Sequence, residues 1–370
     1  MLTGIVKYAQ HYGPWSFYWE PGGLEKAWPK LRTLDIDGII FRDVDKLNEV
    51  RALHIPAIIV GHSKTEVPSL VNVVTDSATI GKIGAEHLLS RGLKHFAFCG
   101  YGNASSDVSP KESFVWSEKR QSSFQEHIRK AGFGVDAYCI SSTSTDKWQQ
   151  ERKKMINWLL SLQKPVGVMA CNDDCGQQVA EACKLANLSI PDAVSILGAD
   201  NDELICGVSS PPMSSIALNF ERAGYESAQM LNDLLRGKKR TRSKITVTAT
   251  HVVVRRSTDY MATSDFNLQK ALQYIRDHIR ENIKVLDVVR AAGMSRRTLE
   301  IKFQREMESS IHNYIKRIRT DQIIRLLVES DLPIGQIADS LGFSDIQHFA
   351  RYFRAGTHMN PLAYRRNFGK

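Results

Sequence analysis

Carboxylate, amide and guanidinium side chains stand where the sequence changes from apolar runs to helix-like segments. Asn172 and Asp173 follow one apolar run, and Asp200 ends the next one. Trp116 and Arg120 are one helical turn apart at the start of another helix-like segment. A ligand with many hydroxyls requires planar groups that donate or accept hydrogen bonds in pairs, together with an aromatic wall. These five residues are therefore candidates for binding a ligand rich in hydroxyl groups.

Structural roles are also open to three of these residues. Asp173 can cap the N-terminus of the helix that follows it. Arg120 and Asp200 can form an ion pair that stabilises the fold without contacting a ligand. The residue types and their spacing leave these alternatives open.

A different set of candidates lies in two similar phrases near the C-terminus. They read GMSRRTLEIKFQRE (293–306) and GFSDIQHFARYFR (342–354). Each follows a segment, 285–292 or 334–341, in which apolar residues recur with the i, i+3, i+4, i+7 spacing of one buried helix face. Each phrase therefore predicts a second helix that follows a short turn.

The turn chemistry supports this interpretation. Gly293 and Gly342 can adopt the left-handed conformation that ends a helix. Ser295 in the first phrase, and Ser344 or Asp345 in the second, can cap the next helix. Two helices joined by a tight glycine turn, the second with a polar outer face, form a helix-turn-helix. The second helix of such a unit fits the major groove of B-DNA.

The tail from about residue 267 to 368 resembles the DNA-binding domain of the AraC/XylS family. The two phrases are joined by the amphipathic stretch 310–330, and the run 337–366 ends with the proline, tyrosine and arginine that are typical of the family. The chain departs from the family at Thr320 and Ile323, where leucine and alanine are usual. We therefore expect different packing around these two positions.

This resemblance implies which exposed side chains contact DNA. Arginine can read guanine, glutamine can read adenine, and an acidic side chain can accept a hydrogen bond from cytosine. Lys302, Arg305 and Arg354 are better placed for phosphates, which fix position without reading sequence. For each single residue, a solvated surface role is the alternative. The implied base readers are Arg296, Arg297, Glu300 and Ile301 in the first unit, and Asp345, Ile346, Gln347, His348 and Arg351 in the second.

Up to about residue 255 the pattern is different, because short β-branched runs alternate with amphipathic helices. This alternation predicts an α/β fold with mostly parallel sheets, which bind ligands at the carboxyl ends of their strands. The predicted strands are 37–41, 56–61, 95–100, 166–171, 194–200 and a final strand in 246–258, and helices are predicted at 78–92 and 174–188.

This first region resembles the sugar-binding domain of LacI/GalR-type repressors, a two-lobed periplasmic-binding-protein fold. The phrases that carry the likeness are 71–100, 169–203 and 214–238. The resemblance implies that Arg120, Asn172, Asp173 and Asp200 contact sugar hydroxyls. Such a domain normally follows a helix-turn-helix, whereas here it precedes one of the AraC type. That order resembles the subfamily of xylose operon regulators, and it implies xylose or a related pentose as the effector.

The two resemblances predict both the start of the natural protein and its division into domains. Sugar-binding domains of this type open with a hydrophobic strand inside the sheet, and this first strand has no counterpart before the helix-like start of the sequence. We therefore expect the natural product to begin about twenty residues upstream of Met1. The expected parts are an effector domain at 1–256, a linker at 257–266, and a DNA-binding domain at 267–370 with helix-turn-helix motifs at about 285–306 and 334–355.

Charge and composition agree with this plan. The formal net charge is +9, and residues 260–370 supply +6 of it through 18 Lys and Arg against 12 Asp and Glu. Such an excess is typical of a nucleic-acid partner, although a solvated helical surface gives the same balance. Six scattered cysteines and a polar N-terminal stretch predict a reduced, cytoplasmic protein. No apolar run is long enough for a membrane helix.

Motifs for catalysis or cofactors are not recognisable. The sequence lacks the glycine-rich phosphate loop of ATP-dependent enzymes. Cys171 and Cys175 are four residues apart, but no second cysteine or histidine pair completes a zinc site. We therefore expect no enzyme, no metal and no cofactor.

The sequence as a whole predicts a transcription regulator of sugar catabolism genes. Its expected partners are a double-stranded DNA operator, a sugar effector, a second copy of the chain and, if it activates transcription, RNA polymerase. The alternative is a free-standing sugar-binding protein, or a sugar-modifying enzyme with a DNA-binding tail.

Overall fold

The computed structural model describes most of the chain, and its residues form two compact units, each described by itself below. The described residues are 1–31, 33–42, 46–61, 66–102, 114–140, 148–259, 265–307 and 309–369. The first unit comprises Met1–Ser77, Gly102–Lys119 and Leu218–Ala249, and the second comprises Ala78–Tyr101, Arg120–Ala217 and Thr250–Lys370.

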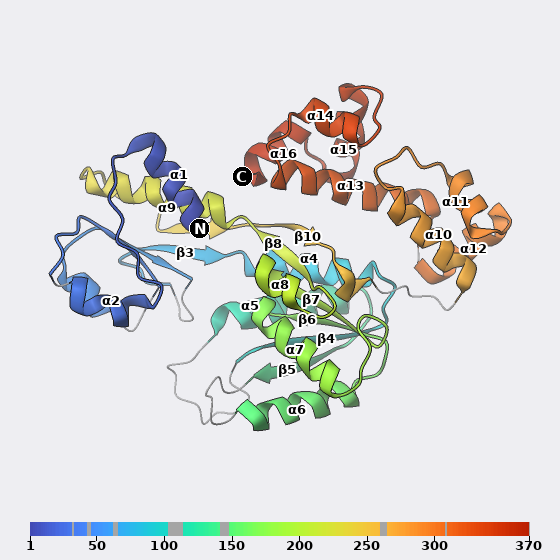
Figure 1. Ribbon diagram of the computed structural model, residues 1–370, viewed down its shortest axis with the longest axis horizontal. Helices are drawn as coiled ribbons and strands as arrows, with labels where there is room; N and C mark the ends of the chain where they lie inside the picture. The colour runs from blue at the N-terminus through green and yellow to red at the C-terminus, as the bar shows by residue number, and fades with distance from the viewer. Residues whose placement is uncertain are drawn as a thin grey trace. The chain divides into compact units, whose positions relative to one another are not determined.

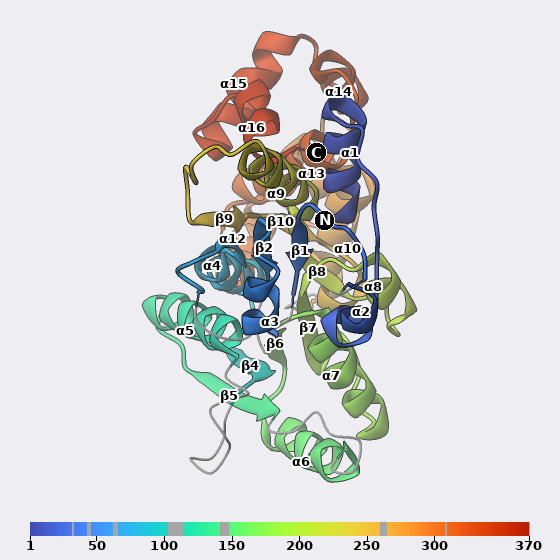
Figure 2. The same ribbon diagram turned by 90° about the vertical axis from the view of Figure 1, so that its left-hand side faces the viewer.

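The first unit is built on a parallel sheet with the strand order β1-β2-β3-β9. Successive residues of β2 face opposite sides of the sheet. Ile59 packs with α2 and α3, and Ile58 packs with α9. The helix α1 lies alongside α9 (Figure 1, Figure 2). The bounds are α1 (Leu2–Tyr12), α2 (Gly23–Leu31), β1 (Ile39–Phe41), α3 (Leu47–Ala52), β2 (Ala57–Val60), β3 (Val71–Thr75), α9 (Phe220–Leu235) and β9 (Lys244–Val247).

The second unit contains a six-stranded sheet with the order β10-β8-β7-β6-β4-β5. The strands from β8 to β5 are parallel, so their carboxyl ends share one edge of the sheet. The strand bounds are β4 (His95–Tyr101), β5 (Val135–Ile140), β6 (Val166–Ala170), β7 (Val194–Asp200), β8 (Ser214–Leu218) and β10 (Ala249–Val253). The helices include α4 (Ser77–Leu89) and α5 (Val115–Lys130), whose first residues belong to the first unit. The others are α6 (Trp148–Ser161), α7 (Asp173–Leu185) and α8 (Glu203–Val208).

The predicted final strand in 246–258 is wrong as a single element. It divides into β9 and β10, which belong to different sheets, and a 3-10 turn at Arg256–Thr258. The break falls at Thr248, whose carbonyl accepts a hydrogen bond from the backbone N–H of Asn219 instead of extending a strand. Because both strands are apolar and β-branched, their pattern does not show which sheet each one joins.

The described tail, 265–307 and 309–369, is helical. Two separate cores lie along the linking helix α13, one on α10–α12 and the other on α14–α16, and Figure 1 and Figure 2 show the two helix groups at its opposite ends. Among the predicted linker residues, 260–264 lie outside the described part of the chain. The helices are α10 (Phe266–Asp277), α11 (Val285–Ala292), α12 (Arg296–Met307), α13 (Ile311–Glu329), α14 (Ile334–Ser340), α15 (Ile346–Thr357) and α16 (Pro361–Phe368).

The two departures from the AraC/XylS pattern have a local explanation. Ile323 is fully buried in the second core. Thr320 faces Gly356, where an added Cβ would lie 3.0 Å from the Thr320 hydroxyl oxygen. Gly356 on α15 thus leaves room for the Thr320 side chain on α13.

Within the described residues, no helix is both long and apolar enough to span a membrane.

Candidate ligand site and nucleic-acid interface

Arg120 and Asp200 meet at the carboxyl edge of the second sheet. Arg120 lies in the first turns of α5 and is 2% exposed, and its Nη2 is 3.2 Å from the Asp200 carboxylate. The same guanidinium donates to the carbonyl oxygen of Cys171, which directly follows β6. Asp200 ends β7 with a φ of 102°, in the left-handed region. The fold therefore brings together a guanidinium and a carboxylate that the sequence separates by eighty positions.

Asp173 is held in a buried polar network beside this pair. Its carboxylate accepts a hydrogen bond from the Ser215 hydroxyl at 2.5 Å and another from the backbone N–H of Asp202 at 2.7 Å. Burial, with a smaller contribution from Asp200, raises the pKa of Asp173 to about 7, although these hydrogen bonds oppose the shift. Gly198 leaves the space that the Asp173 carboxylate occupies.

The N-cap of α7 is Asn172, so the capping role considered for Asp173 belongs to its neighbour. The Asn172 Oδ1 accepts from the backbone N–H of Cys175 at 3.0 Å. Asp173 is the first helical residue and instead bonds to β8 and to the turn after β7.

Trp116 occupies the first turn of α5, as its spacing from Arg120 predicted. It is half-buried and packs edge-on against Phe114, with ring centroids 6.4 Å apart. Trp116 belongs to the first compact unit, whereas the other four candidates belong to the second.

Sequence reasoning missed two polar residues of the network around Asp173. Ser215 lies within β8, and Asn201 directly follows Asp200; the backbone N–H of Asn201 donates to the Ser215 hydroxyl at 3.0 Å. A serine inside a strand carries no pattern that identifies it. An asparagine after a strand is a signal that could have been used.

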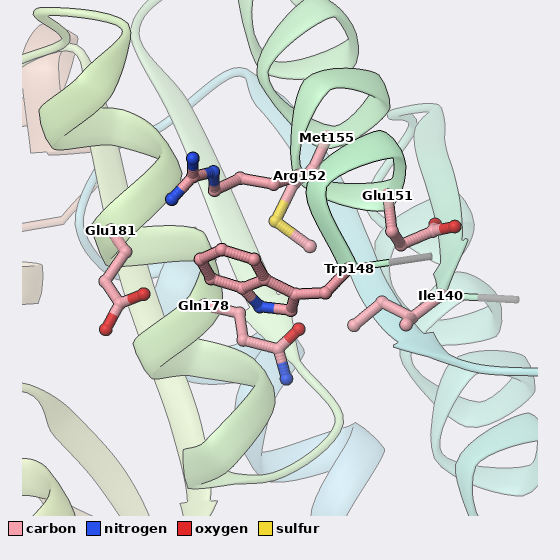
Figure 3. Close-up of a pocket in the computed structure, with 7 residues that line it drawn as sticks. All are labelled: Ile140, Trp148, Glu151, Arg152, Met155, Gln178 and Glu181. Carbon is pink, nitrogen blue, oxygen red and sulfur yellow. The ribbon is translucent and has the colours of Figure 1, made fainter. Parts of the chain in front are cut away.

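A pocket elsewhere in the second unit contains none of the predicted ligand residues. It encloses about 200 Å³ between α6, α7 and the end of β5. Figure 3 shows the Trp148 indole at its centre, with Arg152 and Glu181 toward one side. The Arg152 guanidinium lies 4.3 Å from the Trp148 ring centroid. The candidate sugar site is therefore defined by the hydrogen-bonding groups around Arg120, Asp173 and Asp200, and this pocket is separate from it.

The first helix-turn-helix has the predicted turn and cap. Gly293 adopts a φ of 64°, and the Ser295 hydroxyl accepts from the backbone N–H of Thr298 at 3.2 Å. Leu299 and Phe303 are fully buried, as their spacing predicted. The implied contact residues Arg296, Arg297, Glu300, Ile301 and Arg305 are exposed, and Lys302 is half-buried.

Several of these side chains already have partners in the protein. Arg296 pairs with Glu300 at 2.8 Å, one turn apart on α12. Lys302 forms an ion pair with Asp265, the residue that caps α10. A base or phosphate must therefore compete with these carboxylates for the two basic groups.

The second helix-turn-helix repeats the arrangement with a different cap. Gly342 has a φ of 68°, and the Asp345 carboxylate accepts from the backbone N–H of His348 at 2.6 Å. This bond holds the pKa of Asp345 below its usual value. The second core also contains Arg319, which donates to the Leu341 carbonyl. All the implied contact residues here are exposed: Asp345, Ile346, Gln347, His348, Arg351 and Arg354.

Two regions of the chain match known protein families. Residues 85–258 match the periplasmic binding protein-like domain, and residues 288–367 match a helix-turn-helix domain. The xylose operon regulatory protein of Haemophilus influenzae is 30% identical over 342 residues, which cover 91% of this chain and 87% of that protein. The chain belongs to the family of xylose operon regulatory proteins.

Two further similarities extend over nearly the whole length of this family member. The xylose operon regulatory protein of Escherichia coli K12 is 28% identical over 371 residues, 99% of this chain and 93% of that one. A solved xylose-binding transcription activator has 25% identity and a TM-score of 0.60, covering 100% of this chain and 94% of the other. The protein is thus a transcription regulator that joins a periplasmic-binding-protein-like domain to a helix-turn-helix DNA-binding domain.

Proposed function

We propose that a pentose, xylose in the first place, binds at Arg120 and Asp200 and changes the affinity of the tail for its operator. The observation that carries this proposal is the Arg120–Asp200 pair at the carboxyl edge of a parallel sheet, where such folds bind ligands. A fixed guanidinium and carboxylate can donate to and accept from neighbouring sugar hydroxyls. The relatives named for the xylose operon support the choice of sugar.

Other residues have proposed supporting roles. Asn172 and Asp173, at the N-terminus of α7, position this end of the helix for the ligand. On the DNA side, Arg297, Gln347 and Arg351 read bases, and Arg305 and Arg354 contact phosphates, since all five are exposed on α12 or α15. The protein acts by binding, without catalysing a reaction on the sugar.

We further propose that the regulator works as a homodimer in the cytoplasm, and that it contacts RNA polymerase when it activates. Leu204 and Val208 support self-association, because these aliphatic residues lie one turn apart on α8 and are 80% and 75% exposed.

Two measurements test the proposal. Calorimetry of the full chain with xylose, ribose, arabinose and glucose should show saturable binding, tightest for xylose. Fluorescence anisotropy with a duplex selected by the protein from random DNA should show an operator affinity that changes when xylose is added. Equal affinity with and without every sugar would contradict the proposed function, and conversion of a sugar to product would favour the enzyme alternative.

A further inference from the structure

The segment 255–259, called here the connector, leads from β10 toward α10 and is bonded at its start to the candidate sugar site. The Arg255 guanidinium donates to Asn201 Oδ1 at 2.9 Å and to the Met213 carbonyl at 2.9 Å. Asn201 directly follows Asp200, and its backbone N–H is bonded to the Ser215 hydroxyl that also holds Asp173. Arg255 is therefore bonded to the residue that directly follows Asp200, whose carboxylate is proposed to bind the sugar.

The middle of the connector is bonded to the sheet through buried hydroxyls. The Thr258 Oγ1 donates to Ser214 Oγ at 2.7 Å, and the Ser257 hydroxyl donates to the Ile196 carbonyl at 2.6 Å. Ser214 Oγ in turn donates to the Arg255 carbonyl at 3.0 Å. All three hydroxyl residues are at most 1% exposed, and each bond lost there would leave a buried polar group without its partner.

The end of the connector contacts the DNA-binding tail and the helix α4. Asp259 forms an ion pair with Arg276 on α10. The His87 ring of α4 lies 2.9 Å from the Thr258 hydroxyl. A second contact joins the same end of α4 to the tail, because Arg317 on α13 donates to the Ser90 carbonyl at 3.2 Å.

The turn that carries Asp200 and Asn201 is held in an unusual backbone conformation. Asp200 and Asn201 have positive φ angles of 102° and 52°, which residues other than glycine rarely adopt. Such conformations persist because the surrounding contacts hold them. The Arg255–Asn201 bond joins this turn directly to the connector.

We propose that Arg255 and Thr258 are positioning residues that couple the sugar site to the DNA-binding tail through hydrogen bonds along the connector. This inference rests on the proposed function, since it requires a sugar at Asp200. Coupling through the connector requires that a variant lose the sugar response while both of its binding sites remain intact.

The test uses the full chain, the selected operator duplex and xylose, with Arg255→Met as the first variant. We expect the wild type to change its operator affinity by about tenfold on saturation with xylose, within the usual range of coupling between two sites. Arg255→Met should reduce this change to less than about twofold. Its affinities for xylose alone, by calorimetry, and for operator without sugar should stay within about twofold of the wild type.

The neighbouring Arg256 provides the matched control, because it is exposed and adjacent to Arg255. Arg256→Met should retain the full response. Thr258→Val, which preserves the side-chain shape and removes the hydroxyl, gives a second test if Arg255→Met fails to fold by circular dichroism. It should also reduce the response.

The outcomes separate the two proposals. A full xylose response in a folded Arg255→Met protein, or in Thr258→Val when Arg255→Met does not fold, would overturn the coupling role and leave the proposed function standing. An equal loss of response in Arg256→Met would also overturn the coupling role of Arg255. The loss would then follow from removing any positive charge in the connector, and not from breaking the Arg255–Asn201 bond. A wild-type protein that binds xylose but shows no operator response would contradict the proposed function itself.

Discussion

The candidate sugar site and the candidate DNA face hold their side chains in opposite ways. At the sugar site, Arg120 and Asp173 are each 2% exposed, and they are fixed by bonds to Cys171 after β6, Asp202 in the turn after β7, and Ser215 within β8. On the DNA face, nearly all the candidate side chains are exposed, and Arg296 bonds within its own helix. A small ligand requires groups fixed in advance, whereas long exposed side chains can adjust to a groove.

The largest effect on stability is expected at Asp173, in the buried network of the sugar site. The folded protein holds the Asp173 proton more tightly than the unfolded chain does, because the folded pKa of about 7 lies above the usual value of 3.8 for an aspartate. Its contribution to stability is therefore full below about pH 4 and is lost as the pH rises to about 7. Asp173→Asn should remove this slope and raise the stability at pH 8 by an amount on the order of 4 kcal/mol.

Urea unfolding of both proteins from pH 4 to 8 measures this effect. Identical pH profiles for the wild type and Asp173→Asn would show that Asp173 is ionised and solvated in the folded protein. The polar groups of the sugar site would then be hydrated and not fixed in advance by burial.

Removing the Arg120 guanidinium should have the next largest effect. Arg120→Met keeps much of the side-chain volume but removes the ion pair with the partly exposed Asp200 and the bond to the Cys171 carbonyl, which should cost about 1–3 kcal/mol of stability. We expect calorimetry to show no xylose binding, while hydrogen exchange in α10–α16 stays at the wild-type level. Asp200→Ala should lose binding in the same way. Normal sugar binding in both variants would place the ligand elsewhere.

On the DNA face, the largest single loss is expected at Arg297. Arg297→Ala should weaken binding to the selected operator by about 1–3 kcal/mol and relax the preference at one base pair. Stability should not change, because the side chain is exposed. Anisotropy against a panel of single-base operator variants measures both affinity and preference. A loss that is equal for all sequences would make Arg297 a phosphate contact.

The two recognition helices should differ in their response to acid. The pKa of Asp345 is lowered by the hydrogen bond from His348, so its stabilisation of α15 is present above the unfolded pKa and is lost as the pH falls through the folded pKa. Ser295, the corresponding cap in the first unit, does not titrate there. Hydrogen exchange at pH 7 and pH 3 should show selective fraying of α15, and Asp345→Asn should abolish that selectivity.

The smallest effect is expected at Lys302. It is ion-paired with Asp265 in the free protein, so the gain from a phosphate is partly offset by the pair that breaks. Lys302→Ala should weaken binding to all DNA sequences alike and reduce the slope of log affinity against log salt by about one. An unchanged slope would show that Lys302 stays on Asp265 when DNA is bound.

The sequence by itself determined the elements whose signals are local. Both helix-turn-helix units were predictable, because helical periodicity, a glycine turn and an N-cap residue all lie within about twenty positions of one another. The buried positions of Leu299 and Phe303 on α12 follow from the same periodicity. The strands β1, β2, β4, β6 and β7 were predicted from short apolar runs of the same local kind.

Only the tertiary structure decided features that depend on residues far apart in the chain. It separates 246–258 into strands of two sheets, bonds Asp173 to Ser215, and pairs Lys302 with Asp265. The bond from Arg255 to Asn201 joins positions that no local pattern connects. Periodicity fixes which face of an element is buried, but the partner of a polar side chain is set by whichever distant group the packing of the core brings within hydrogen-bonding distance.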